Sequence, residues 1–150
     1  MDRLTQYRIF VRVAELGGFT RAADSLGLPK ASASAAVRRL EAALGAQLFE
    51  ELLATRRDID AVFFCNDDLA QGGLLAAHRL RIPVPGRVAI AGFNDLAGSD
   101  QMLPPLTTVH TPRVEVGEAG ARMLLQLMRG EKPSPSCVKL PYRVVVRQST

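Results

Sequence analysis

Four polar residues near position 30 carry side chains that can hydrogen-bond to double-stranded DNA. They lie in residues 30–44, where apolar residues recur at spacings of three and four, which predicts an amphipathic helix. The polar residues are Lys30, Ser32, Ser34 and Arg38, and the apolar stripe is Leu28, Val37, Leu40 and Leu44. A helix that buries this stripe leaves amino, hydroxyl and guanidinium groups free to face a groove.

The residues before this helix are suited to holding it at an angle to a second helix. Residues 20–27 predict a short helix, with the small residue Ala23 at the helix contact and Leu26 as an apolar anchor. Gly27 follows, and glycine readily takes the positive φ that a tight turn requires. A further amphipathic helix is expected over residues 2–16. The sequence therefore predicts a helix-turn-helix.

The usual docking of this motif assigns a role to each polar residue, because the second helix enters the major groove by its N-terminal end. The residues expected nearest the base edges are Lys30, Ser32 and Ser34, and those nearest the phosphates are Thr20, Arg21 and Arg38. Thr20 has a compatible alternative role as the N-cap of its helix.

Residues 1–49 resemble the N-terminal winged helix-turn-helix of LysR-type transcriptional regulators. The matching residues are Met1-Asp2, Gly18-Phe19-Thr20-Arg21-Ala22-Ala23, Leu26-Gly27, Ser34, Arg38-Arg39-Leu40-Glu41, Leu44-Gly45 and Leu48-Phe49. The resemblance implies DNA binding, but the family's wing and linker helix are missing here. Two positions also depart from the family pattern. Ala35 replaces a usual Arg or Lys, which removes a bidentate guanine contact, and Pro29 replaces a capping Ser or Thr.

A second group of polar residues follows two predicted parallel strands. Asn66 and Asp67 come after residues 61–65, and Asn94 and Asp95 come after residues 87–92. Ligands of open α/β sheets bind at the carboxyl ends of the strands, where amides and carboxylates can hydrogen-bond to the hydroxyls of a sugar or sugar acid. Asn and Asp are also common in turns and at helix N-caps, and the spacing alone favours that structural role.

The remainder of the chain, residues 48–150, resembles the C-terminal part of LacI/GalR-family repressors, and in particular gluconate-type repressors. The matching stretches are 48–54, 60–72, 88–95, 104–109 and 140–147. The resemblance implies that Asn66 and Asp67 contact an effector, whereas Asn94-Asp95 is expected to be a turn. It also implies a homodimer, with the helix at 67–81 and the loop at 98–106 near the interface. Only the end of the two-lobed core is present, so any effector binding is expected to be weak.

Together the two resemblances indicate a fusion, natural or engineered, joined at Leu48-Phe49. The expected fold class is α/β. An all-α helix-turn-helix domain without its wing, residues 1–49, precedes a truncated periplasmic-binding-protein-like α/β lobe, residues 50–150, which contains a βαβ unit. The other expected helices are 47–56, 67–81 and 112–129, and the other strands are 106–109 and 138–147, with strands 61–65 and 87–92 buried. A lobe cut from a larger core is expected to expose apolar faces and to self-associate.

Composition fits this interpretation without deciding it. The chain has 150 residues, with 19 Lys and Arg against 15 Asp and Glu, a formal net charge of +4. Cys65 and Cys137 are expected to be buried free thiols in a reducing compartment, and no apolar run is long enough to span a bilayer. The expected location is the cytoplasm, and the expected partners are double-stranded DNA, a sugar or sugar-acid effector and a second copy, but no membrane.

Catalysis is not expected, because the chain has no nucleophile elbow, phosphate-binding glycine loop or metal-ligand motif. No cofactor or metal is expected, and His78 and His110 are interpreted as structural or surface residues. One alternative stays open: a small-molecule-binding or dimerisation module whose DNA-binding head is not functional.

Overall fold

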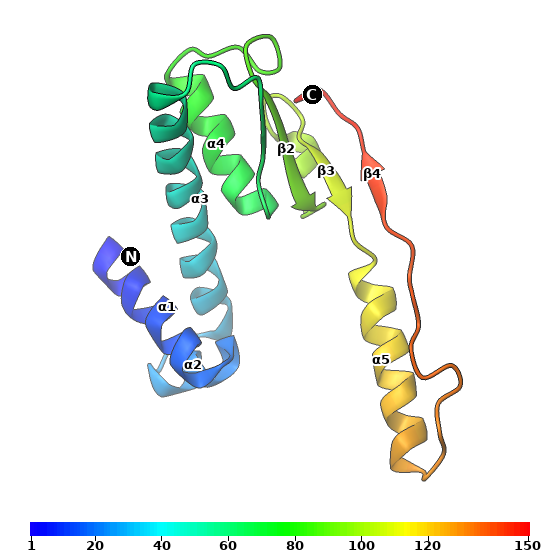
Figure 1. Cartoon of the computed structure of the whole chain (residues 1–150). Helices are drawn as coiled ribbons and strands as arrows, with labels where there is room; N and C mark the ends of the chain where they lie inside the picture. The colour runs from blue at the N-terminus through cyan, green and yellow to red at the C-terminus, as the bar shows by residue number, and fades with distance from the viewer.

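The computed structural model describes residues 1–150 and begins with three helices (Figure 1). They are α1 (Arg3–Leu16), α2 (Phe19–Ser25) and α3 (Lys30–Thr55). The Asp2 side chain caps α1 by accepting a hydrogen bond from the Thr5 amide. Gly18, not Thr20, occupies the N-cap of α2, so the capping role of Thr20 is wrong. Gly27 takes a φ of 65° in the turn before α3.

A small apolar core holds these three helices together. It consists of the buried residues Ile9, Ala23, Ala33 and Ala36. Three of the four are alanine, so the helix backbones approach one another closely at this point. The predicted small contact at Ala23 is confirmed, because this residue is fully buried.

The third helix is continuous over 26 residues, which contradicts the two separate helices expected at 30–44 and 47–56. Gly45 lies inside the helix and is buried against the backbone of Leu69 on α4 (Asp67–Arg79). Glycine weakens a helix, but here its missing side chain permits the close packing of α3 on α4. Leu48-Phe49, the expected junction, therefore lies within one unbroken helix, with Phe49 in the main core.

The main sheet has four strands in the order β1-β2-β3-β4. They are β1 (Ala61–Phe63), β2 (Ala89–Asn94), β3 (Thr107–His110) and β4 (Arg143–Val145). β1 pairs parallel with β2 and β2 parallel with β3, whereas β4 is antiparallel. The expected βαβ unit, β1-α4-β2, is confirmed. A short 3₁₀ helix, η1 (Ser99–Gln101), lies between β2 and β3.

The main core lies on the side of the sheet that α4 and the C-terminal half of α3 cover. Its buried members include Phe49, Leu74, Val88, Ile90 and Leu106. The expected burial of strand 61–65 on both faces is wrong, since Phe63 is 62% exposed and β2 alternates between buried and half-buried residues. Only one face of the sheet is covered (Figure 1), so a single set of alternate residues enters the core.

The last helix, α5 (Arg113–Met128), extends away from the sheet and contains no buried residue (Figure 1). Residues 129–142 return alongside α5 to reach β4 (Figure 1), so the strand expected over 138–147 is shorter than predicted. On the apolar side expected on this helix, Ala119 and Met123 are half-buried, whereas Val116, Leu124, Leu127 and Met128 are exposed, so the prediction of exposed apolar faces is confirmed. None of the helices has the length and apolar character needed to cross a membrane.

Candidate functional site

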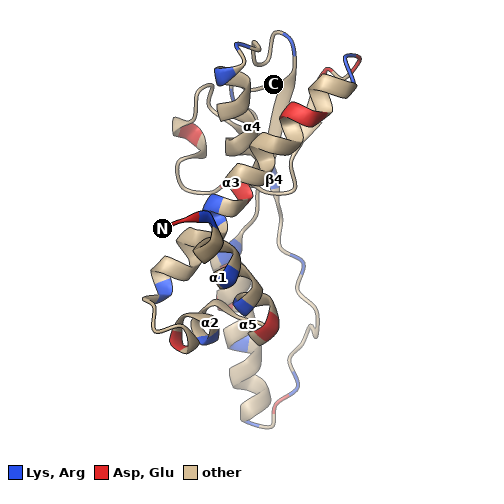
Figure 2. Ribbon diagram, turned by 90° about the vertical axis from the view of Figure 1, so that its left-hand side faces the viewer, with Lys and Arg blue, Asp and Glu red and all other residues tan.

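The residues expected to contact DNA base edges lie at the free N-terminal end of α3. Lys30 is the first helical residue and is exposed, whereas Ser32 and Ser34 are half-buried beside the small core. Thr20 and Arg21, expected at phosphates, are exposed on α2. The Arg21 guanidinium donates to the Gly17 carbonyl at 3.2 Å. Basic and acidic residues are interspersed over the N-terminal helices rather than gathered in one patch (Figure 2).

Arg38, the third expected phosphate contact, has a partner within the chain. Its Nε donates to Asp68 Oδ1 at 3.0 Å. The Arg38 side chain is 58% exposed and that of Asp68 only 10%, so the pair lies at the edge of the α3–α4 contact. Arg38 can face a phosphate only in competition with this carboxylate.

A second polar contact links α3 to the start of α4. Asn66 Nδ2 donates to Glu41 Oε1 at 2.9 Å, and Asn66 Oδ1 accepts from the Leu69 amide at 2.8 Å. Asn66 is therefore the N-cap of α4, which confirms the capping interpretation. Burial raises the pKa of Glu41, although the hydrogen bond from Asn66 partly offsets the effect.

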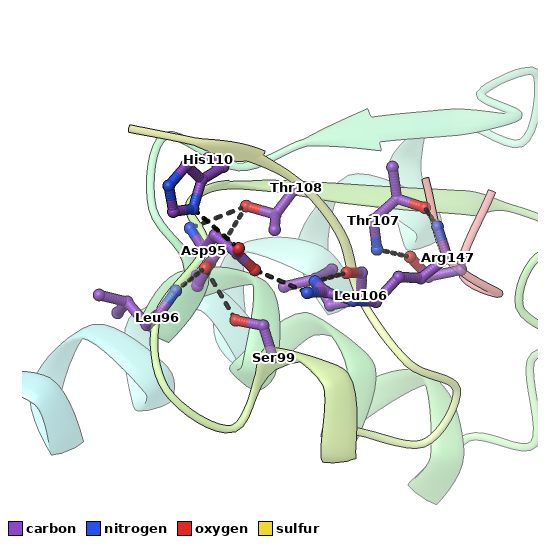
Figure 3. A network of polar contacts seen from close by, with 10 residues as sticks. Asp95, Leu96, Ser99, Leu106, Thr107, Thr108, His110 and Arg147 are labelled. Carbon is purple, nitrogen blue, oxygen red and sulfur yellow. Dashed lines mark hydrogen bonds and ion pairs between the residues drawn. The ribbon is translucent and has the colours of Figure 1, made fainter. Parts of the chain in front are cut away.

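Asp67, the other expected effector contact, is fully buried. Its carboxylate accepts hydrogen bonds from the Leu96 amide at 2.7 Å, from Ser99 Oγ at 2.9 Å and from Thr108 Oγ1 at 2.6 Å (Figure 3). Asp67 thereby ties the start of α4 to β3 and to the loop after β2. Its contact with an effector stays a prediction, and in this structure the carboxylate faces the protein interior.

Gly92 on β2 provides the space for this carboxylate. A side chain at Gly92 would overlap Asp67 Oδ1. The turn expected at Asn94-Asp95 is wrong in its position, since Asn94 is the last residue of β2 and pairs with His110, although both residues have positive φ, 104° and 51°. Asn and Asp tolerate this conformation better than most residues.

A charged cluster at the same sheet edge was not predicted from the sequence. Arg147 Nη2 donates to Asp95 Oδ1 at 2.7 Å, and Asp95 Oδ2 lies 3.0 Å from His110 Nδ1 (Figure 3). Burial alone would raise the pKa of Asp95, but the contacts with Arg147 and His110 outweigh it and lower the pKa below its usual value. The sequence separation of 52 residues between Asp95 and Arg147 hides this pair from any local pattern.

The cysteine prediction is half right. Cys65 and Cys137 are free thiols, but both are exposed rather than buried. Cys65 follows a strand of which one face is uncovered, and Cys137 lies in the exposed segment after α5. No group of three or more His, Cys, Asp or Glu side chains is arranged to hold a metal ion.

Comparison with known proteins identifies the family. The model of the periplasmic binding protein-like domain matches residues 10–150, nearly the whole chain. The chain belongs to this family. The match of the periplasmic binding protein-like domain begins within α1, so it includes most of the segment expected to be a separate DNA-binding head.

Similar proteins of this family are transcriptional regulators. The HTH-type transcriptional regulator GntR of Pseudomonas aeruginosa is 46% identical over 108 residues, 72% of this chain and 32% of the regulator. The crystal structure of the transcription regulator GntR from Chromobacterium violaceum is 48% identical with a TM-score of 0.70, over 72% of this chain and 40% of that one. The Lac repressor dimer bound to operator and an anti-inducer is 28% identical with a TM-score of 0.64, over 73% of this chain and 38% of that one.

These relatives support the resemblance of the C-terminal part to LacI/GalR-family repressors. The chain spans about a third of the length of the curated regulator it matches. None of these three relatives is a LysR-type regulator, so the LysR-type resemblance of residues 1–49 and the fusion stay predictions. The similarity to regulators rather than enzymes agrees with the absence of a catalytic motif.

Proposed function

We propose that this protein is a DNA-binding transcriptional regulator whose helix α3 reads the major groove. The observation that carries the proposal is the arrangement of α2 and α3 around the turn at Gly27, which leaves Lys30 at an exposed helix end. The expected LysR-type resemblance of residues 1–49 also supports DNA binding through α3. The similarity of the remainder to LacI-family regulators adds a truncated sensor lobe to this head.

The mechanism follows from the chemistry of the exposed end. Lys30, Ser32 and Ser34 donate hydrogen bonds to base edges, while Thr20, Arg21 and Arg38 contact phosphates. Because Ala35 cannot make a bidentate contact with guanine, phosphate contacts provide most of the affinity and sequence selectivity is modest. The regulator acts in the cytoplasm as a homodimer, since two copies can contact two half-sites.

Effector binding is the second element of the proposal. A sugar or sugar acid would bind at the carboxyl ends of β1 and β2, close to Asn66 and Asp67. Asn66 contacts Glu41 on α3, and Asp68 contacts Arg38 on the same helix. A ligand that moves the start of α4 would therefore act directly on the helix that reads DNA.

The test is a titration of fluorescent duplex DNA with the full chain at several salt concentrations. Affinity should fall steeply with salt, because bound Lys and Arg displace condensed counterions. Lys30→Ala should weaken binding, and Arg21→Ala, which removes an expected phosphate contact, should reduce the salt slope by about one contact. The control Lys139→Ala, exposed after α5, should do neither. If the full chain shows no affinity for duplex DNA even at low salt, the regulator function is wrong.

One alternative function is favoured by a specific contact. The Arg38–Asp68 pair withdraws a basic residue from the expected DNA face, as a small-molecule-binding or dimerisation module with a non-functional head would allow. Calorimetry with gluconate and with neutral sugars distinguishes the two. Heat of binding without DNA affinity supports the module, and DNA affinity supports the regulator.

A further inference from the structure

The helices α1 and α3 enclose a groove beside their small core. The core residues Ile9, Ala33 and Ala36 hold the two helices together near α2, because alanine side chains permit close contact. Nearer the N-terminus the facing side chains are larger, and Figure 1 shows the start of α1 standing away from α3. The space between the two helices is a cavity of about 180 Å³. An apolar cavity of about 150 Å³ admits benzene, so this groove has room for one ring of a small molecule.

One wall of the groove is aromatic and the other is aliphatic. Tyr7 and Phe10 of α1 lie one helical turn apart and are about half exposed. The facing wall consists of Val37, Leu40 and Leu44 of α3. The sequence predicts that these three side chains are buried, but Val37 and Leu40 are only half-buried and Leu44 is 48% exposed. The chain itself therefore leaves the apolar stripe of α3 incompletely covered at this point.

A carboxylate lies between these apolar walls. Glu41 lines the groove one turn before Leu44 and is half-buried. It accepts a hydrogen bond from the neutral Asn66 amide, but it forms no ion pair with a Lys, Arg or His side chain. Arg38, on the preceding turn, is paired with Asp68 instead. A partly buried carboxylate without a cation is incompletely stabilised, which agrees with the raised pKa of Glu41.

The one cation that lines the groove is Arg3, which could anchor an anion instead. Arg3 is exposed at the start of α1 and forms no ion pair with Glu41. Water and salt screen an exposed charge more strongly than a half-buried one, so the field within the groove is set mainly by Glu41. Tyr7 and Phe10 favour the same sign of ligand, because the faces of aromatic rings attract cations.

We propose that the groove between α1 and α3 binds a small organic cation, an ammonium group attached to one apolar ring or to a short branched chain. The ammonium group donates hydrogen bonds to Glu41 while the apolar part packs between Tyr7 and Leu44. This site is separate from the one proposed at the strand ends for a sugar or sugar acid. It depends neither on DNA binding nor on that effector.

Three probes that share one ring and differ in their head group test the charge preference. Cyclohexylmethylamine is the cation, cyclohexylmethanol the neutral analogue and cyclohexanecarboxylate the anion. They are titrated into the full chain carrying Tyr142→Phe, in which Tyr7 is the only tyrosine and no tryptophan is present, and calorimetry is run in parallel. The cation should bind at least tenfold more tightly than the alcohol and change the Tyr7 fluorescence. Equal affinities, a preference for the carboxylate, or neither heat nor a fluorescence change with the cation would overturn the proposal.

Substitutions in the groove test where the cation binds. Glu41→Gln keeps the size of the side chain and its acceptor for Asn66 but removes the charge. It should weaken cation binding at least tenfold and leave the alcohol unaffected. Leu44→Lys places an ammonium group in the groove and should abolish cation binding. The control Glu15→Gln removes a carboxylate from an exposed pair with Arg12 and should change nothing.

Circular dichroism checks that each variant is folded. Unchanged cation affinity in folded Glu41→Gln and Leu44→Lys proteins would place the cation elsewhere and overturn the site.

The same measurements distinguish a small molecule from a second copy of the chain in the groove. If a second copy filled it, cation affinity would fall as protein concentration rises, and Leu44→Lys would lower the mass measured by light scattering. Either result would overturn the cation site. DNA affinity is measured separately by the duplex titration, so a failure of the regulator function and a failure of this inference are distinguishable.

Discussion

Gly45 on α3 and Gly72 on α4 both lie where these two helices cross, and neither position has room for a methyl group. A Cβ on Gly72 would overlap the Ala42 carbonyl oxygen, and a Cβ on Gly45 would overlap the Leu69 backbone. The two glycines let the backbones touch. Helix α3 and the sheet domain are therefore joined by direct backbone packing rather than by a flexible linker.

This crossing predicts that Gly72→Ala destabilises the protein, although alanine is the better helix former. The added methyl group should cost about 1–3 kcal/mol, more than the roughly 0.5–1 kcal/mol that alanine contributes to a helix. Urea unfolding measures the difference. The matched control is Gly120→Ala on α5, where the methyl group meets nothing in the chain and should be neutral or stabilising.

The ion pair between Arg38 and Asp68 predicts that Asp68→Asn tightens DNA binding. Removing the carboxylate frees Arg38 for a phosphate, and the change should raise affinity roughly two- to fivefold at low salt. The salt dependence of the duplex titration should become steeper. Asp58→Asn removes the same charge from an exposed pair with Arg56 at the far end of α3, and should leave the affinity unchanged. Equal effects of the two substitutions would contradict a specific role for Asp68.

The burial of Asp67 predicts a structural cost for its removal. Asp67→Ala leaves the Leu96 amide, the Ser99 hydroxyl and the Thr108 hydroxyl without their acceptor, and should lower the free energy of unfolding by at least about 2 kcal/mol. Thermal and urea unfolding without any sugar measure this loss. An unchanged stability would mean that the carboxylate is not buried as described.

The lowered pKa of Asp95 predicts acid sensitivity. An unfolded Asp has a pKa of about 3.9, and the folded value lies below it because of Arg147 and His110. The stabilisation is therefore complete above the unfolded pKa and is lost as pH falls through the folded pKa. Asp95→Asn should flatten the decline in stability as pH falls below about 4, as measured by urea unfolding.

The pKa of Glu41 is shifted in the opposite direction from that of Asp95, so a Glu41 variant serves as the comparison. Its raised pKa means that the folded state binds the proton more tightly than the unfolded state. The resulting stabilisation is present below the unfolded pKa, about 4.3, and is lost as pH rises through the folded value. Glu41→Gln should remove that pH dependence. An identical response of the Asp95 and Glu41 variants to acid would contradict these assignments.

Local patterns in the sequence predict much of this fold. Apolar periodicity locates α1, α2, α4 and α5 to within a few residues, and the turn residue Gly27 is placed correctly. These features depend on neighbouring residues alone. The continuity of α3 does not, because the close contact of Gly45 with α4 is visible only after the chain has folded.

In the candidate site, too, local features could be predicted from the sequence, whereas contacts between distant residues could not. Asn66 is recognised as a cap from its position, since capping is a local interaction. The partners of Asp67 come from three segments about 30 to 40 residues away, and Arg147 reaches Asp95 over 52 residues. Burial of β1 on one face only is equally non-local, because it depends on whether a second layer covers the sheet.

Because helix α3 is unbroken, it also fixes how the N-terminal helices are rotated relative to the sheet and α4. At 1.5 Å per residue its 26 residues span about 39 Å, and successive residues are rotated by about 100° around the helix axis. One residue inserted into α3 would rotate Lys30 and Ser34 by about a quarter turn relative to the crossing at Gly45 and Gly72. The orientation of the exposed N-terminal end of α3 relative to the sheet is therefore fixed by the number of residues in one continuous helix.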